Sequence, residues 1–140
     1  MYPVGHDILI VDDNPARRDA ISICLEREGF SVTAVAEGLA AIRIAQRHRF
    51  ALVVAASALP GSLDGAATLS QLRARQPWVK VLFIGDVSRR PRRPGADGED
   101  FISVPFQKRE LIGCVFELLQ REIVPGGELL RRSRLELGVQ

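Results

Sequence analysis

The sequence predicts a doubly wound α/β domain, in which helices cover both faces of a five-stranded parallel sheet. Short runs of β-branched and apolar residues alternate with amphipathic stretches along the chain. These runs are apolar at consecutive positions, as is typical of strands buried on both faces of a parallel sheet. The strict alternation of the two kinds of segment favours the same architecture. In such sheets, ligands bind beyond the carboxyl ends of the strands.

Five segments have the composition of strands. Each is a short apolar run bounded by polar or turn-forming residues. They are residues 7–11 (DILIV), 30–35 (FSVTAV), 51–56 (ALVVAA), 79–84 (VKVLFI) and 100–104 (DFISV). The residues expected at the centre of the core are Val53, Val54, Val81, Leu82 and Ile84.

Four segments between or after the strands have helical periodicity. Asn14 predicts an N-cap and Pro15 a first helical residue, and Gly29 ends this helix after residue 28. The other helices are expected at residues 38–48, 65–75 and 108–121. The residues expected to face the core are Ala20, Ile21, Cys24 and Leu25 in the first helix, Leu39, Ile42 and Ala45 in the second, and Leu111, Val115, Leu118 and Leu119 in the last.

Residues 85–100 break this alternation, because they read GDVSRRPRRPGADGED where another helix is expected. Pro91 and Pro94 would each remove a helical hydrogen bond, so the fourth helix is expected to be shortened or irregular. A domain is expected over residues 5–122. Residues 123–140 follow as a tail, for which a short helix and a frayed end are both consistent with the sequence.

Composition excludes several classes of protein. The 140 residues are 46% hydrophobic and 26% charged, which is typical of one globular domain. No apolar run approaches the roughly 20 residues of a membrane span, and the amino-terminal residues do not resemble a signal peptide, so a cytoplasmic protein is expected. The net charge of +2 does not favour nucleic acid as a partner. Cys24 and Cys114 are expected to be buried, reduced thiols.

Three short motifs follow strands in a fixed order along the chain. They are VDDNP at residues 11–15, LPG at 59–61 and VPF at 104–106. In this order they resemble the receiver domain of bacterial two-component response regulators, and the segment from Lys80 to the proline-rich stretch most resembles receivers of hybrid histidine kinases. The resemblance covers about residues 5–122. It implies a flavodoxin-like (CheY-like) sheet of strand order 2-1-3-4-5, and a phosphoryl group that passes from a histidine kinase to an aspartate.

That family's chemistry needs an acid pair, a phospho-acceptor aspartate, a hydroxyl and a lysine. Mg²⁺ requires oxygen ligands, and the phosphoryl oxygens require donors that absorb negative charge. The acid pair is present as Asp12 and Asp13. The resemblance places Ala56 at the phospho-acceptor position, Gly85 at the hydroxyl position and Val104 at the lysine position. Because three of the four roles are absent, the acid pair is interpreted as a remnant that binds Mg²⁺ weakly at best.

The other matched positions predict local structure. Asp13 and Asn14 are expected to accept hydrogen bonds from backbone donors at the start of the first helix, with Asp12 partly solvated. Phe101 matches the aromatic residue whose rotation reports phosphorylation in the family, and a plain core residue is an equally good interpretation. Pro105 preserves a turn that in the family is often a cis peptide.

Two functions of different class are consistent with these residues. The first is a stand-alone pseudo-receiver that is not phosphorylated on aspartate. It would bind a signalling protein, such as a histidine kinase, through the fourth strand, the Arg-rich segment, the fifth strand and the last helix. The second is a module that binds an anionic second messenger such as cyclic di-GMP, because guanidinium groups form bidentate contacts with phosphate. Its candidate ligand-binding residues are Arg89, Arg90, Arg92 and Arg93.

An enzyme is not expected from this sequence. No nucleophile with an adjacent base, no metal cluster and no Gly-rich phosphate loop can be assembled from the residues present. Accordingly, no cofactor is expected beyond weak binding of Mg²⁺.

Overall fold

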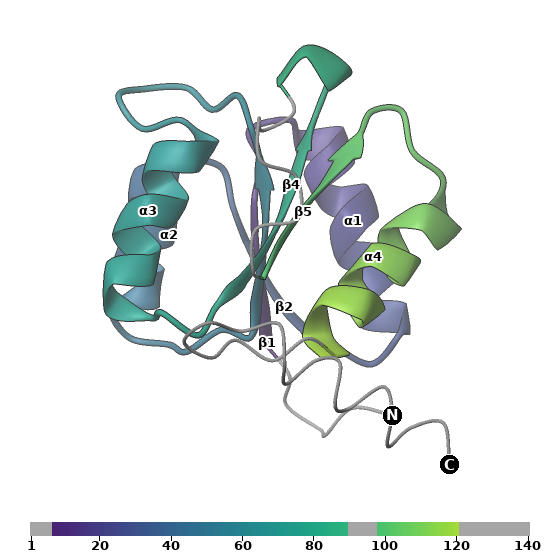
Figure 1. Cartoon of the computed structure of the whole chain (residues 1–140), viewed down its shortest axis with the longest axis horizontal. Helices are drawn as coiled ribbons and strands as arrows, with labels where there is room; N and C mark the ends of the chain where they lie inside the picture. Colours follow the sequence, from purple (N-terminus) through teal and green to yellow (C-terminus); the bar gives the residue numbers. More distant parts are fainter. Residues whose placement is uncertain (1–6, 90–97, 121–140) are drawn as a thin grey trace.

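Five parallel strands, one from each expected segment, form the sheet at the centre of the structure (Figure 1). The structure is a computed structural model and describes residues 7–89 and 98–120. Along the chain the elements are β1 (Asp7–Val11), α1 (Pro15–Arg27), β2 (Ser31–Val35), α2 (Gly38–Ala45), β3 (Leu52–Ala56), α3 (Gly65–Arg75), β4 (Lys80–Gly85), the 3₁₀ turn η1 (Val87–Arg89), β5 (Glu99–Ser103) and α4 (Lys108–Gln120). The strand order is β2-β1-β3-β4-β5, which confirms the predicted doubly wound fold.

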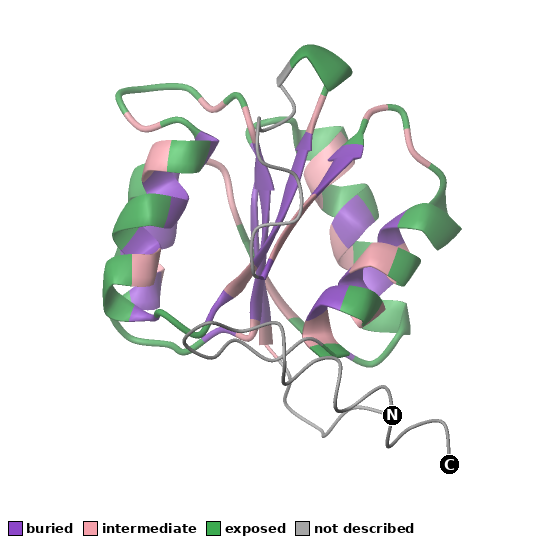
Figure 2. Cartoon of the chain, in the orientation of Figure 1, coloured by how far each residue is buried: buried purple, intermediate pink, exposed green. Residues whose placement is uncertain are grey.

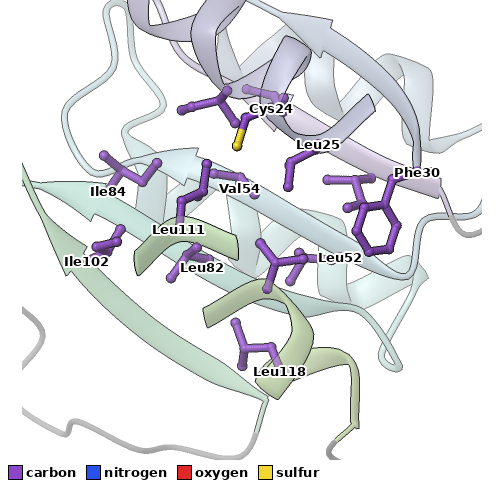
Figure 3. Packing of buried hydrophobic residues seen from close by; sticks show 14 residues of the cluster. Cys24, Leu25, Phe30, Leu52, Val54, Leu82, Ile84, Ile102, Leu111 and Leu118 are labelled. Carbon is purple, nitrogen blue, oxygen red and sulfur yellow. The ribbon is translucent and has the colours of Figure 1, made fainter. Parts of the chain in front are cut away.

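The sheet separates two hydrophobic cores. Successive side chains of a strand point to opposite faces, so β1, β3 and β4 contribute alternate residues to each core. One core lies beneath α1 and α4 and includes Ile8, Ile10, Leu25, Leu52, Val54, Leu82, Ile84, Leu111 and Leu118 (Figure 3). The other lies beneath α2 and α3 and includes Leu9, Val11, Ala41, Val53, Leu69, Leu72, Val81 and Phe83. Figure 2 shows the buried strands between helices whose outer surfaces are exposed. The five residues predicted at the centre of the core are all buried.

The first helix begins as predicted. The Asn14 side-chain oxygen accepts a hydrogen bond from the Arg17 backbone N–H at 3.0 Å, and Pro15 is the first residue of α1. Gly29 follows the helix with a φ of 98°, a left-handed conformation that glycine adopts without steric penalty. These local signals fix the position of α1 after β1, and therefore the position of the acid pair between them.

The predicted orientation of α2 is wrong at Leu39, which is 49% exposed. The residues of this helix that face the core are Gly38, Ala41, Ile42 and Ala45. The reason is the close approach of α3, because a Cβ on Gly38 would lie 2.1 Å from the Thr68 hydroxyl oxygen. Three small residues and Ile42 therefore face inward. The helix ends at Ala45, before the predicted end. Ala20 of α1, also expected on the inner face, is exposed.

The two cysteines differ in their surroundings. Cys24 is buried in the core beneath α1, as predicted, whereas Cys114 is only half-buried on α4, which corrects the expectation for that residue. Both are free thiols. Burial raises the pKa of the Cys24 thiol, so this side chain stays protonated to higher pH than an exposed cysteine.

Part of the predicted organisation lies outside the described residues. This applies to most of the Arg-rich segment, at 90–97, and to the predicted tail at 123–140. The described beginning of the segment after β4 is the single turn η1, in agreement with a shortened fourth helix. Within residues 7–89 and 98–120, no helix is long and apolar enough to cross a membrane.

Candidate functional site

The motifs singled out in the sequence converge at the carboxyl edge of the sheet. Asp12 directly follows β1, Ala56 ends β3 and Gly85 ends β4. The backbone register aligns Ala56 with Ile84, and Gly85 with Ser103, so these strand ends are neighbours. The site is therefore assembled by the sheet topology from residues far apart in the sequence.

Asp12 is the most constrained residue of this edge. Its side chain is buried, with 1% of the residue exposed, although the sequence predicted partial solvation; that prediction is wrong. The Arg17 guanidinium binds both carboxylate oxygens, with Nε donating to Oδ2 at 2.5 Å and Nη2 donating to Oδ1 at 2.8 Å. The Asn14 backbone N–H also donates to Oδ1, at 3.0 Å. In addition, Arg18 Nη1 donates to the Asp12 backbone carbonyl at 2.8 Å.

Arg17 lies beside both acids of the pair. The hydrogen bond to Asp12 raises the pKa of the Arg17 guanidinium, burial acts in the opposite direction, and the charges of Asp12 and Asp13 raise it further. The Asp13 residue itself is exposed. The structure places Asp12 and Asn14, rather than Asp13, on the backbone donors at the start of α1. Asp12 of the acid pair is therefore already bound to an internal cation.

The residues present do not fit the magnesium site that the resemblance implies. Mg²⁺ needs near-octahedral oxygen coordination and usually one or two carboxylates that are free to bind it. Both Asp12 oxygens accept hydrogen bonds from Arg17, and Ala56 offers no side-chain oxygen. Across the part of the chain that the structure describes, no group of three or more His, Cys, Asp and Glu side chains could hold a metal ion.

The end of β3 is closed by tight backbone contacts. The Ser57 N–H donates to the Ile84 carbonyl at 2.8 Å, and the Ser57 carbonyl accepts the Gly65 N–H at 3.1 Å. A Cβ on Gly65 would lie 2.4 Å from the Ala56 carbonyl oxygen, so the start of α3 packs directly on this strand end. The Ala56 methyl is buried. This position therefore offers only a hydrocarbon side chain.

Gly85 borders a small space that other side chains fill. A Cβ at Gly85 would lie 3.1 Å from the Ser57 hydroxyl oxygen and 3.7 Å from Cε2 of Phe101. Phe101 is only 8% exposed and belongs to the core beneath α2 and α3. Of the two interpretations left open by the sequence, its position in this structure is that of a core residue. The ring packs beside a glycine that has no hydroxyl to offer.

The turn after β5 has the expected geometry. The Val104–Pro105 peptide bond is cis. The Val104 N–H donates to the Gly85 carbonyl at 2.9 Å, and the Val104 side chain packs against the core beneath α1 and α4. At the position that the resemblance gives to a lysine, an apolar side chain is thus directed into the protein.

The predicted anion site cannot be assembled from the described residues. Arg89 ends η1, whereas Arg90, Arg92 and Arg93 lie outside the ranges that the structure describes. In the described part, the Asp86 carboxylate accepts hydrogen bonds from the Ser88 N–H, at 3.0 Å, and from the Ser88 hydroxyl. Binding of an anion by the four arginines stays a prediction.

Sequence reasoning missed the roles of Arg17 and Arg18. Both follow Asp12 within six positions and lie on the first turn and a half of α1. The available signal was an arginine five residues after a strand-terminal aspartate, with a helix N-cap between them. An arginine at that spacing lies on the first turn of the helix, so its long side chain can reach the carboxylate at the end of the strand.

Comparison with known proteins agrees with this architecture. A model of the response regulator receiver domain family matches residues 8–116. The chain is 32% identical over 117 residues to a probable transcriptional regulatory protein, TcrX, of Mycobacterium tuberculosis, covering 81% of this chain and 50% of that protein. It is 29% identical over 120 residues to the transcriptional regulatory protein SrrA of Staphylococcus aureus, covering 84% of this chain and 49% of that protein. The chain therefore spans about half the length of these relatives.

Solved structures show the same fold. The receiver domain of the hybrid histidine kinase CckA superimposes with a TM-score of 0.71 at 26% identity, covering 81% of this chain and 98% of that one. The receiver domain of the sensor histidine kinase PA1611 from Pseudomonas aeruginosa has a TM-score of 0.71 at 29% identity, covering 82% of this chain and 98% of that one. That receiver coordinates a magnesium ion in its active-site cleft. The acid pair of the present chain holds Arg17 instead.

Proposed function

The chain belongs to the response regulator receiver domain family, whose members are signalling modules of two-component systems, and from this premise we propose that it is a pseudo-receiver that is not phosphorylated on aspartate. The observation that carries the proposal is the buried methyl of Ala56 at the end of β3. The resemblance assigns the phospho-acceptor to this position, and a methyl group has no oxygen to accept a phosphoryl group. We therefore propose that the protein signals without being phosphorylated on an aspartate.

The Arg17–Asp12 pair supports a module that works without metal. A divalent cation would have to displace two charge-assisted hydrogen bonds, each of which contributes about 1.5–3 kcal/mol. It would gain at most two carboxylates, since Ala56 supplies none. Residual binding of Mg²⁺ at Asp12 and Asp13 is consequently proposed to be weak, and the module is proposed to need no cofactor and to have no enzymatic activity.

The packing at Gly85 supports a module held in one state. Phe101 packs in the core beside Gly85. Because Gly85 has no hydroxyl group, it cannot couple the orientation of the Phe101 ring to phosphorylation at the end of β3. We therefore expect the β4–η1–β5–α4 face to present one constant surface. Its proposed partner is another two-component protein, such as a histidine kinase, that binds this surface without transferring a phosphoryl group.

The proposal is tested by incubating the protein with acetyl phosphate and Mg²⁺ and measuring its intact mass. We expect no added phosphoryl group. Ala56→Asp restores a carboxylate, but we expect weak phosphorylation, because Gly85 and Val104 leave the phosphoryl oxygens without two stabilising donors. Ser57→Ala is the matched control for modification of the neighbouring hydroxyl. A phosphoryl group that is carried by an aspartate of the parent protein would overturn the proposal.

The alternative function, binding of an anionic second messenger, rests on the sequence alone. It is tested by calorimetric titration with cyclic di-GMP. If the Arg-rich segment is the site, the double substitution Arg89→Ala and Arg93→Ala should abolish binding and leave the thermal midpoint unchanged, and added salt should weaken binding by the parent protein. A parent protein that does not bind, or a double variant that binds equally well, removes this alternative.

A further inference from the structure

A rigid aromatic and cationic cluster lies at the amino ends of the strands, at the opposite edge of the sheet from Asp12. Trp78 is the only tryptophan of the chain and is 39% exposed. Its indole N–H donates to the Phe50 carbonyl at 3.2 Å. The Arg49 guanidinium carbon lies 4.5 Å from the centroid of the Trp78 ring, within the range of a cation–π interaction.

Buried hydrogen bonds hold the two loops that carry this cluster. The Gln76 side chain is buried, and its Nε2 donates to the Ala45 carbonyl at 2.8 Å and to the His48 carbonyl at 2.7 Å. Its Oε1 accepts the Phe50 N–H at 3.0 Å. The backbone on either side of Arg49 and next to Trp78 is thus held in place before any partner arrives, which lowers the entropic cost of ordering this surface on binding.

Other arginines lie in the loops and helix end at the same edge of the sheet as the tryptophan. Arg47 and Arg49 are exposed in the loop after α2, and Arg75 is exposed at the end of α3. The ion pairs found among the described residues are Arg17–Asp12 and Arg73–Glu99, so none of these three exposed arginines has an acidic partner there. Residues 38–85 contain a single acidic residue, Asp64, which caps the other end of α3.

We propose that Arg47, Arg49, Arg75 and Trp78, here called the Arg–Trp surface, bind a carboxylate-rich segment of a partner protein. Guanidinium groups form bidentate contacts with carboxylates, and tryptophan and arginine are the residues that most often dominate protein interfaces. Single-stranded nucleic acid fits less well, because its binding sites combine a basic groove with several stacking aromatics, and this surface has one. The surface is independent of the acid pair and of the pseudo-receiver proposal.

The test uses Trp78 fluorescence, since no other tryptophan contributes to the signal. A poly-glutamate peptide at low ionic strength should produce a saturable change. Arg47→Ala with Arg75→Ala should weaken binding at least about tenfold, by removing two charge-assisted contacts. Arg27→Ala with Arg109→Ala removes the same charge from exposed positions elsewhere, and should leave the affinity within about twofold.

Three outcomes would overturn the proposal: a parent protein that does not bind the peptide, an Arg47/Arg75 variant that binds as well as the parent, and a control variant that is weakened equally. An oligothymidine that binds through the same arginines where the peptide does not would assign the surface to nucleic acid instead. Thermal unfolding of each variant verifies that it is folded. Arg49→Ala, measured by calorimetry because it alters the fluorescence directly, should also weaken peptide binding.

Discussion

Replacing Arg17 with alanine removes the internal cation of the acid pair. Asp12 would keep one hydrogen bond, from the Asn14 N–H, but would lose both bonds from the guanidinium. Breaking a buried ion pair by removing one partner costs roughly 3–5 kcal/mol. The Arg17 side chain is 27% exposed, so in the variant water can reach Asp12 and replace part of the hydrogen bonding that the carboxylate loses. We therefore expect Arg17→Ala to lower the free energy of unfolding by about 2–3 kcal/mol, below the fully buried range.

The same substitution should make the protein sensitive to magnesium. With Asp12 released from the guanidinium, a dissociation constant of about 1 mM would let about 10 mM Mg²⁺ restore RT ln 11, or about 1.4 kcal/mol. The parent should gain almost nothing. Urea unfolding with and without Mg²⁺ measures both effects. Arg17→Ala with Asp12→Asn, which lacks the freed charge, should not respond to Mg²⁺.

A matched control separates the loss of this contact from the loss of an arginine on α1. Arg27→Ala removes an exposed arginine from the last turn of the same helix and should change stability by less than about 0.5 kcal/mol. The reasoning is refuted if the parent gains as much stability from Mg²⁺ as Arg17→Ala does. It is also refuted if Arg17→Ala is no more destabilising than Arg27→Ala.

Three other substitutions or reactions test the packing. Leu82→Ala, in a fully buried position of β4, should lower the free energy of unfolding by roughly 2–5 kcal/mol in a urea titration, and a loss below about 1 kcal/mol would contradict a central strand. Gly85→Thr places a Cβ 3.1 Å from the Ser57 hydroxyl oxygen and should lower the thermal midpoint. Adding Ser57→Gly should restore most of that loss. Equal midpoints for the single and double variants would count against this contact. Burial raises the pKa of the Cys24 thiol, and the thiolate is the form that reacts with iodoacetamide. Peptide mapping should therefore show that iodoacetamide modifies Cys114 well before Cys24. Equal rates of modification would show that burial does not protect Cys24.

The fold was predictable because several independent signals in the sequence agree. Apolar runs located the strands, and the Asn14–Pro15 cap located the start of the first helix to the residue. The prediction for α2 was wrong because hydrophobicity alone chose Leu39 as an inner residue. The inner face was instead decided by a contact with another helix, since only glycine at position 38 leaves room for Thr68. Such a contact depends on the spacing between two helices, which no local pattern contains.

The candidate site was predictable in its location but not in its contacts. Topology brings the carboxyl ends of the strands together, so the positions of Asp12, Ala56 and Gly85 followed from the fold. The burial of Asp12 did not follow, because an aspartate at a strand end is usually solvated. Its burial depends on the conformation of Arg17, a long side chain that could equally have extended into solvent.

The hydrogen bonds of Gln76 constrain how this chain can change in length. One side-chain amide joins the end of α2, the loop that follows it and the chain entering β3, while its own backbone ends α3. A residue inserted in the loop after α2 or in the loop after α3 would move these donors away from their acceptors. Each buried amide group left without a hydrogen bond would lower the free energy of unfolding by about 1–3 kcal/mol. The loop at 60–62, by contrast, is exposed. Fused segments or fluorescent labels should therefore be tolerated at 60–62, and the loops beside Gln76 should keep their native length.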